Sequence, residues 1–214
     1  MIAPGRLGHV LAAPLLLAAL TACTSSTPAA SPAPVGSTPA TISVAEAGEK
    51  LTPYRPAGPE GSTQAGGVLD LDGTVDVLIG ASGTDAKADM QRRLAQRGFV
   101  VAARHSWTAP DGRRADTLLM RFSADPGAEG LAGTLAQDLR SINPDTAFTD
   151  PSDLSTGVVV NTPDSRGRAR VALVAPHGDV VVLNYLTPAT PDKRTAMVLF
   201  HTELGLLPTP GIPW

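Results

Sequence analysis

Two short turn sequences, Ala109-Pro110-Asp111-Gly112 and Ala175-Pro176-His177-Gly178, constrain the fold of this chain more than any other feature. A proline followed by a polar residue and a glycine is typical of a tight turn. Each turn separates two apolar runs of strand length: 99–107 from 115–122, and 168–175 from 179–186. We therefore expect two β-hairpins, one around each turn.

A helix is expected after each hairpin. Over 126–139, Leu131, Leu135 and Leu139 recur four residues apart and so share one face of a helix. A closing helix over 191–206 is stopped by the prolines that follow it. The remaining predicted elements are a helix over 85–97, short strands over 68–79 that turn at Asp72-Gly73, and a strand over 158–161.

The two hairpin-helix (ββα) units lie 66 residues apart, as measured from Ala109 to Ala175. They predict an α+β fold with a single antiparallel sheet and helices on one of its faces. The alternative is that both turns are ordinary hairpin turns of an alanine-, proline- and glycine-rich chain, without an internal duplication.

The N-terminus has the organisation of an export signal. Arg6 is the only charged residue before an apolar run over 10–20. A helix needs about 20 apolar residues to span a bilayer, and this run of about eleven is too short. The run therefore indicates a signal peptide.

The residues that close this run, Leu20-Thr21-Ala22-Cys23, resemble the lipobox of bacterial lipoproteins. The resemblance implies that the Cys23 thiol receives a diacylglycerol. It also implies that a signal peptidase cuts between Ala22 and Cys23, so that the protein is held by lipid on the outer face of the cytoplasmic membrane. Arginine supplies 14 of the 17 basic residues, a bias that suggests a GC-rich genome. As a whole, the chain resembles the small exported lipoproteins of actinobacteria.

Three regions follow from this interpretation. Residues 1–22 are the signal peptide, and 23–48 are the lipidated cysteine with a Thr/Ser/Pro/Ala-rich tether that has no apolar periodicity. Residues 49–214 are long enough for one α+β domain with its own core. The single cysteine excludes an intramolecular disulfide. The net charge of −3 and the absence of a basic patch argue against nucleic acid as a partner.

An enzymatic hypothesis comes from Val68-Leu-Asp-Leu-Asp-Gly-Thr-Val75, which resembles the first motif of haloacid-dehalogenase-type phosphatases. The resemblance implies that Asp70 is a nucleophile forming an aspartyl-phosphate, that Asp72 is the general acid/base, and that Mg²⁺ neutralises the phosphate. It also implies a long buried parallel strand before the motif, whereas a proline- and glycine-rich segment precedes it here. The simpler interpretation of Asp72-Gly73 is a tight turn.

Other catalytic and metal-binding patterns fail on spacing. Asp70, Asp72 and Asp76 do not meet the spacing of a calcium-binding loop. The sequence has no G-x-S-x-G elbow and no paired histidines. Trp107 and Tyr185 are expected at corresponding positions of the two hairpins, either in the core or along an aromatic ligand groove.

The sequence therefore favours a lipid-anchored, extracytoplasmic, non-enzymatic binding or accessory domain with no cofactor and no metal site. Its expected partners are the lipid bilayer and a small ligand, a cell-wall component or a membrane protein. The alternative is a secreted hydrolase, specifically a phosphatase that uses Asp70 and Asp72.

Overall fold

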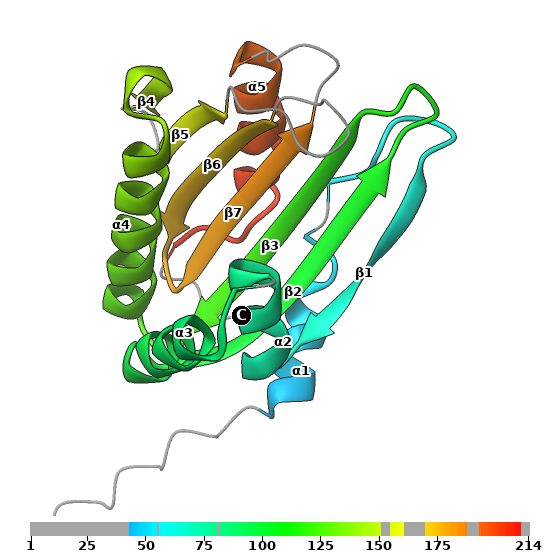
Figure 1. Ribbon diagram of the computed structural model, residues 1–214. Coiled ribbons are helices and arrows are strands. Elements are labelled where there is room, and N and C mark those ends of the chain that lie inside the picture. The colour runs from blue at the N-terminus through cyan, green and yellow to red at the C-terminus, as the bar shows by residue number, and fades with distance from the viewer. Residues whose placement is uncertain are drawn as a thin grey trace, which may run out of the picture. The chain divides into compact units, whose positions relative to one another are not determined.

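Both expected hairpins lie in the middle of one antiparallel sheet in the computed structural model (Figure 1). The structure describes residues 43–54, 56–80, 82–150, 155–160, 170–187 and 193–210. The described helices are α1 (Val44–Leu51), α2 (Leu71–Ile79), α3 (Thr84–Gln96), α4 (Asp125–Ile142) and α5 (Lys193–Leu204). The described strands are β1 (Thr63–Leu69), β2 (Phe99–Thr108), β3 (Arg114–Phe122), β4 (Ala147–Asp150), β5 (Ser155–Val160), β6 (Arg170–His177) and β7 (Val180–Thr187).

The sheet order is β1-β2-β3-β7-β6-β5-β4, and every pairing is antiparallel. The second strands of the two hairpins, β3 and β7, pair with each other in the middle of the sheet. An α+β fold with a single antiparallel sheet is therefore confirmed. The parallel strand that the phosphatase resemblance implies is not found, because β1, which precedes the motif, is an antiparallel edge strand.

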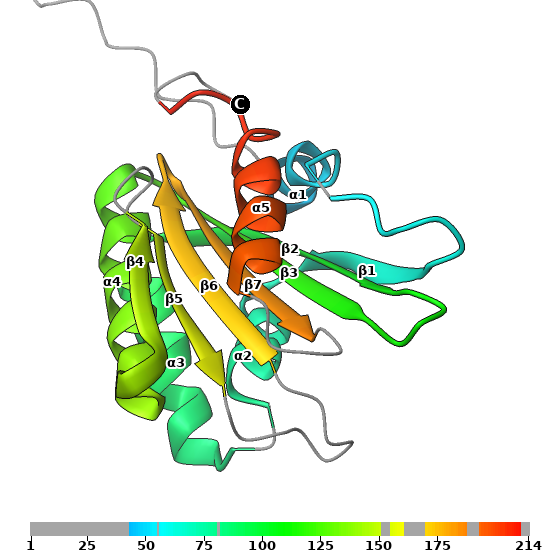
Figure 2. The ribbon, with the colours of Figure 1, turned by 90° about the horizontal axis from the view of Figure 1, so that it is seen from above.

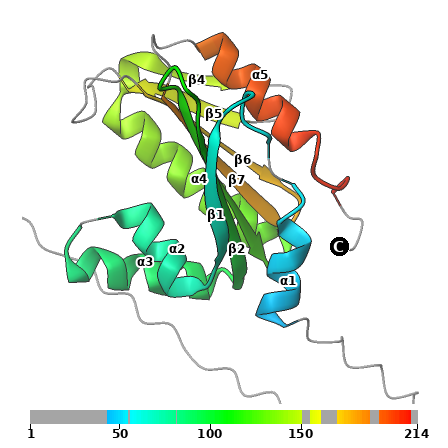
Figure 3. The same ribbon diagram turned by 90° about the vertical axis from the view of Figure 1, so that its right-hand side faces the viewer.

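The helices cover both faces of the sheet, so the prediction that they lie on one face is wrong. Helices α2, α3 and α4 pack on one face and α1 and α5 on the other (Figure 3), each over its own apolar core. The physical reason lies in β7, where the consecutive residues Val180, Val181, Val182 and Leu183 are all buried. An unbroken apolar run places large apolar side chains on both faces of a strand, and both faces then need a cover.

The two hairpin-helix units are not related by a twofold axis. An axis perpendicular to the sheet between the paired strands β3 and β7 would place both following helices on the same face. Instead, α4 packs against Val174 and Val181, whereas α5 lies over β6 and β7 on the opposite face (Figure 2).

The domain begins earlier than the predicted boundary at residue 48. Helix α1 starts at Val44, and its Ala47 and Leu51 are fully buried against the sheet. Ser43 caps this helix by accepting a hydrogen bond from the Glu46 N–H at 3.2 Å. The expected cleavage site at Ala22 and Cys23 lies outside the described residues.

The expected turn at Asp72-Gly73 is also wrong, because both residues lie in the first turn of helix α2. Asp70 is the N-cap of this helix, and its carboxylate accepts a hydrogen bond from the Gly73 N–H at 2.8 Å. Lys87 of α3 forms an ion pair with Asp76 of α2, which joins the two helices. Within the part of the chain described, no helix has the length and apolarity needed to cross a bilayer.

Candidate functional site

Two adjoining pockets, of about 350 and about 410 Å³, lie between helix α2 and the sheet. They share Val77, Leu78, Asp116 and Tyr185, and we refer to the two together as the α2 groove. Figure 1 shows that α4 and the α2–α3 pair cover different parts of this face of the sheet. The groove lies beside α2, where β2, β3 and β7 supply its floor.

The floor of the α2 groove changes from apolar to charged along the strands. The register pairs Leu118 with Leu183 in one row of the sheet and Asp116 with Tyr185 in the next row on the same face. The third row pairs Arg114 with Thr187, and the first residue of β6, Arg170, lines the pocket beside them. A ligand lying along the strands therefore meets Leu118 and Leu183, with Arg104 beside Leu118, at one end. At the other end it meets Arg114 and Arg170.

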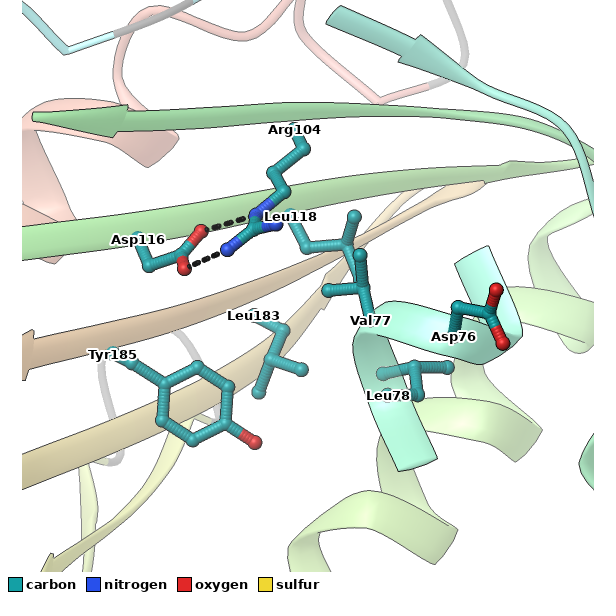
Figure 4. A pocket seen from close by; sticks show the side chains of 8 residues that line it. All are labelled: Asp76, Val77, Leu78, Arg104, Asp116, Leu118, Leu183 and Tyr185. Carbon is teal, nitrogen blue, oxygen red and sulfur yellow. Dashed lines mark hydrogen bonds and ion pairs between the residues drawn. The ribbon is translucent and has the colours of Figure 1, made fainter. Parts of the chain in front are cut away.

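Helix α2 supplies the facing wall of the groove. Val77, Leu78 and Ile79 line it near the C-terminal end of the helix, and their side chains are half-buried. In Figure 4, Val77 and Leu78 face the strands, whereas Asp76 points away from the ion pair on the floor. The Asp76 carboxylate is already paired with Lys87 at 2.6 Å. The wall is thus mainly apolar.

Arg104 and Asp116 form a two-pronged ion pair on the floor (Figure 4). Arg104 donates from Nε to Asp116 Oδ1 at 2.8 Å and from a terminal nitrogen to Oδ2 at 2.5 Å. The hydrogen bond to Asp116 raises the pKa of Arg104, partly offset by burial. This planar geometry fixes both side chains and leaves other guanidinium N–H groups of Arg104 available to donate.

Tyr185 lies at the transition between the apolar and the charged end. Its side chain projects from β7 toward α2 (Figure 4), and the residue is 36% exposed. Burial raises its pKa, while Arg170 acts in the opposite direction. The phenol is therefore neutral at physiological pH and can donate a hydrogen bond. Of the two aromatic residues singled out in the sequence, Tyr185 lines a groove and Trp107 lies in the core on the opposite face.

The charged end of the α2 groove is positive. Arg104 and Arg114 both contact the Asp116 carboxylate, and Arg170 lines the same pocket as Asp116. Arg114 lies 3.5 Å from the Asp116 Oδ2 atom, which Arg104 already occupies. The C-terminus of α2 contributes about half a negative charge at most. The arginines outweigh both, so the described residues at this end carry an excess of positive charge.

The phosphatase candidates Asp70 and Asp72 do not form a phosphate site. Asp70 is committed to the N-cap of α2, and Asp72 accepts a hydrogen bond from Gln91 Nε2 at 2.7 Å. The α2 groove, which lies beside the same helix, is lined by Asp76 but not by these two residues. Asp70 and Asp72 do not fit an aspartyl-phosphate site with Mg²⁺. The reason is that the Asp70 carboxylate caps helix α2 and follows β1, which is an antiparallel edge strand.

The three histidines in the described part of the chain have different surroundings. His105 is buried beside Gln64, His177 faces the Pro208 carbonyl at 2.8 Å, and His201 lies 3.2 Å from Asp150. Among the described residues, no group of three or more His, Cys, Asp or Glu side chains could hold a metal ion.

A second polar cluster is buried on the opposite face, beneath α5. Glu203 Oε2 accepts hydrogen bonds from Asn184 Nδ2 at 2.9 Å and from Thr117 Oγ1 at 3.3 Å. Burial raises the pKa of Glu203 to about 8, although the hydrogen bonds from Asn184 and Thr117 act to lower it. Glu203 is fully buried, so this cluster is a packing feature of α5.

Sequence reasoning missed the α2 groove except for Tyr185. A signal was present in the first hairpin, where Arg104, Arg114 and Asp116 interrupt otherwise apolar strands. Charged side chains near the end of a largely buried strand need partners or an open site. The wall of the groove could not be predicted, because the residues of α2 were expected to form short strands.

Neither a family model nor a curated protein matches the sequence. Among solved structures, the fold is similar to the extracellular domain of PknH from Mycobacterium tuberculosis. The match has a TM-score of 0.39 and 10% sequence identity and covers 73% of this chain and 88% of that chain.

Proposed function

We propose that this protein is a lipoprotein of the outer face of the cytoplasmic membrane whose domain binds a small amphipathic ligand in the α2 groove. The domain acts by binding and does not catalyse a reaction. The observation that carries the proposal is the groove itself, with an apolar wall and a floor that ends in arginines. Small-molecule sites combine apolar surface with a few fixed polar groups that set the orientation of the ligand.

The state of the carboxylate in the groove favours binding over catalysis. A general base needs a carboxylate that is free to take a proton at neutral pH. The Asp116 carboxylate instead receives two hydrogen bonds from Arg104. An arginine held in this way presents fixed donors to a ligand, which is what a recognition site requires.

The membrane location rests on the sequence. The lipobox Leu20-Thr21-Ala22-Cys23 closes an apolar run of signal-peptide length, and Cys23 is the only cysteine in the chain. Lipidation of Cys23 would leave the domain tethered through the segment that precedes α1.

Filling the α2 groove should abolish binding of an uncharged apolar probe. Leu78 is half-buried on the wall of the groove, so Leu78→Trp adds an indole to the space between α2 and β7. We expect the affinity for N-phenylnaphthylamine, a neutral fluorescent probe, to fall at least tenfold because the pocket that receives it is occupied.

Val198→Trp is the matched control, because Val198 is 61% exposed on α5 on the other face of the sheet. Thermal unfolding of both variants shows whether each is folded. Equal probe binding by Leu78→Trp and the wild-type protein would contradict the proposed site.

A further inference from the structure

The two ends of the α2 groove differ in chemistry, and this difference specifies the kind of ligand that fits. Leu118 and Leu183 form the apolar end, and Arg114 and Arg170 form the charged end. Arg114 and Leu118 lie four residues apart on β3, a separation of about 13 Å along a strand. This span suits a ligand with a chain of moderate length and a head group at one end.

The excess of positive charge specifies the sign of the head group. Asp116 accepts two hydrogen bonds from Arg104 and also lies 3.5 Å from Arg114, so its single negative charge is shared by two arginines. Arg170 is exposed at the edge of the groove, and its charge partly offsets the rise that burial causes in the pKa of the Tyr185 phenol. A neutral head group would gain no charge attraction from these arginines, and a cationic head group would be repelled by them.

The donors at this end suit an anionic head group with oxygen acceptors, of which a carboxylate is one. Arginine presents a planar fork of N–H groups that binds a carboxylate through two parallel hydrogen bonds. The Tyr185 hydroxyl and the Thr187 hydroxyl line the same pocket and can add single hydrogen bonds. The apolar chain would then lie between Leu78 on α2 and Leu183 on β7.

We infer that the α2 groove selects a single-chain amphiphile with a carboxylate head, of the fatty-acid type. Its head is bound by Arg114 and Arg170, and its chain lies against α2. This inference rests on the proposed function and adds the chemical class of the ligand.

Isothermal titration of the protein with three ligands of equal chain length tests the inference. Decanoate carries an anionic head, decanol a neutral head and decyltrimethylammonium a cationic head. We expect decanoate to bind at least tenfold more tightly than decanol, because hydrogen bonds from the arginines to a charged head group are stronger than those to a neutral hydroxyl. The cationic ligand should bind most weakly, and added salt should reduce the preference for decanoate.

The double variant Arg114→Gln/Arg170→Gln should lose the preference for decanoate and retain the affinity for decanol. The matched control is Arg92→Gln/Arg93→Gln, which removes the same charge from exposed arginines of α3. The control variant should keep the tenfold preference.

The outcomes separate this inference from the proposed function. Equal binding of decanoate and decanol by the wild-type protein would overturn the carboxylate head and leave an apolar binding groove. Tighter binding of the cationic ligand would also overturn it. Failure of all three ligands together with the neutral fluorescent probe would overturn the proposed function itself.

Discussion

Glu203→Gln should raise the free energy of unfolding above pH 8 by on the order of 5 kcal/mol. Glu203 is fully buried, and burial raises its pKa to about 8 from the usual 4.5. Ionising a buried carboxylate costs stability, and the neutral amide of glutamine avoids that cost.

The contacts of Glu203 explain why glutamine should fit. Its Oε1 atom and the Asn184 Oδ1 atom are both buried and accept no hydrogen bond, while Asn184 Nδ2 donates to Glu203 Oε2. Protonation of the carboxyl turns the Glu203 Oε1 atom into a donor. The glutamine Nε2 group supplies that donor permanently and preserves the acceptor for Asn184 and Thr117.

The pH dependence has a definite sign. The pKa of Glu203 is higher in the folded than in the unfolded protein, so the neutral carboxyl stabilises the folded state. This contribution to the free energy of unfolding is fully present below about pH 4.5 and is lost as pH rises toward about 8. Chemical denaturation across this range should show a declining free energy of unfolding for the wild-type protein and a flatter profile for Glu203→Gln. Glu129→Gln, at an exposed position of α4, is the control and should follow the wild-type profile. Parallel profiles for all three proteins would contradict the assignment.

Cys23→Ser should release the protein from the membrane fraction completely. A serine hydroxyl cannot replace the thiol that a lipoprotein signal presents for diacylglycerol transfer, and the chain contains no second cysteine. Fractionation of cells that express the full chain, with metabolic labelling by a palmitate analogue, gives the measurement.

Ser26→Ala, three residues further along the chain, is the control and should remain lipidated and membrane-bound. A Cys23→Ser protein that stays in the membrane fraction after a carbonate wash would rule out lipid anchoring through this residue.

The central sheet could be predicted because its signals are local. Pro-x-Gly turns between apolar runs identified β2 with β3 and β6 with β7, and the four-residue recurrence of leucines identified α4. The order in which the hairpins pair, and the face that each helix covers, depend on contacts between distant segments. The buried apolar runs 171–175 and 180–183 were local signs that both faces are covered.

The first two helices were missed although each has a cap signal. Ser43 and Glu46 have the spacing of a capping box at the start of α1. In α2, Leu71, Val75 and Leu78 recur at helical spacing behind the N-cap Asp70. The Asp72-Gly73 pair suggested a turn, and a turn was therefore predicted in place of the helix. Strand β1 shows no alternation of buried and exposed residues, since nearly all of its residues are exposed.

The α2 groove could not be predicted for the same reason. Its floor comes from the predicted hairpins, but its wall comes from a helix that was expected to be strand. Charged residues on β2 and β3 indicate a site only when one knows that α2 lies beside them and leaves them partly open. Asp70, which the sequence offered as a nucleophile, instead fixes the start of that wall.

Amide chemical-shift mapping of the isotope-labelled protein during titration with N-phenylnaphthylamine tests ligand binding in the α2 groove most directly. The account predicts that the perturbed amides lie at Val77, Leu78, Leu183 and Tyr185, with little change on α5. Perturbation confined to Met197 and Val198 of α5, on the opposite face of the sheet, would contradict it.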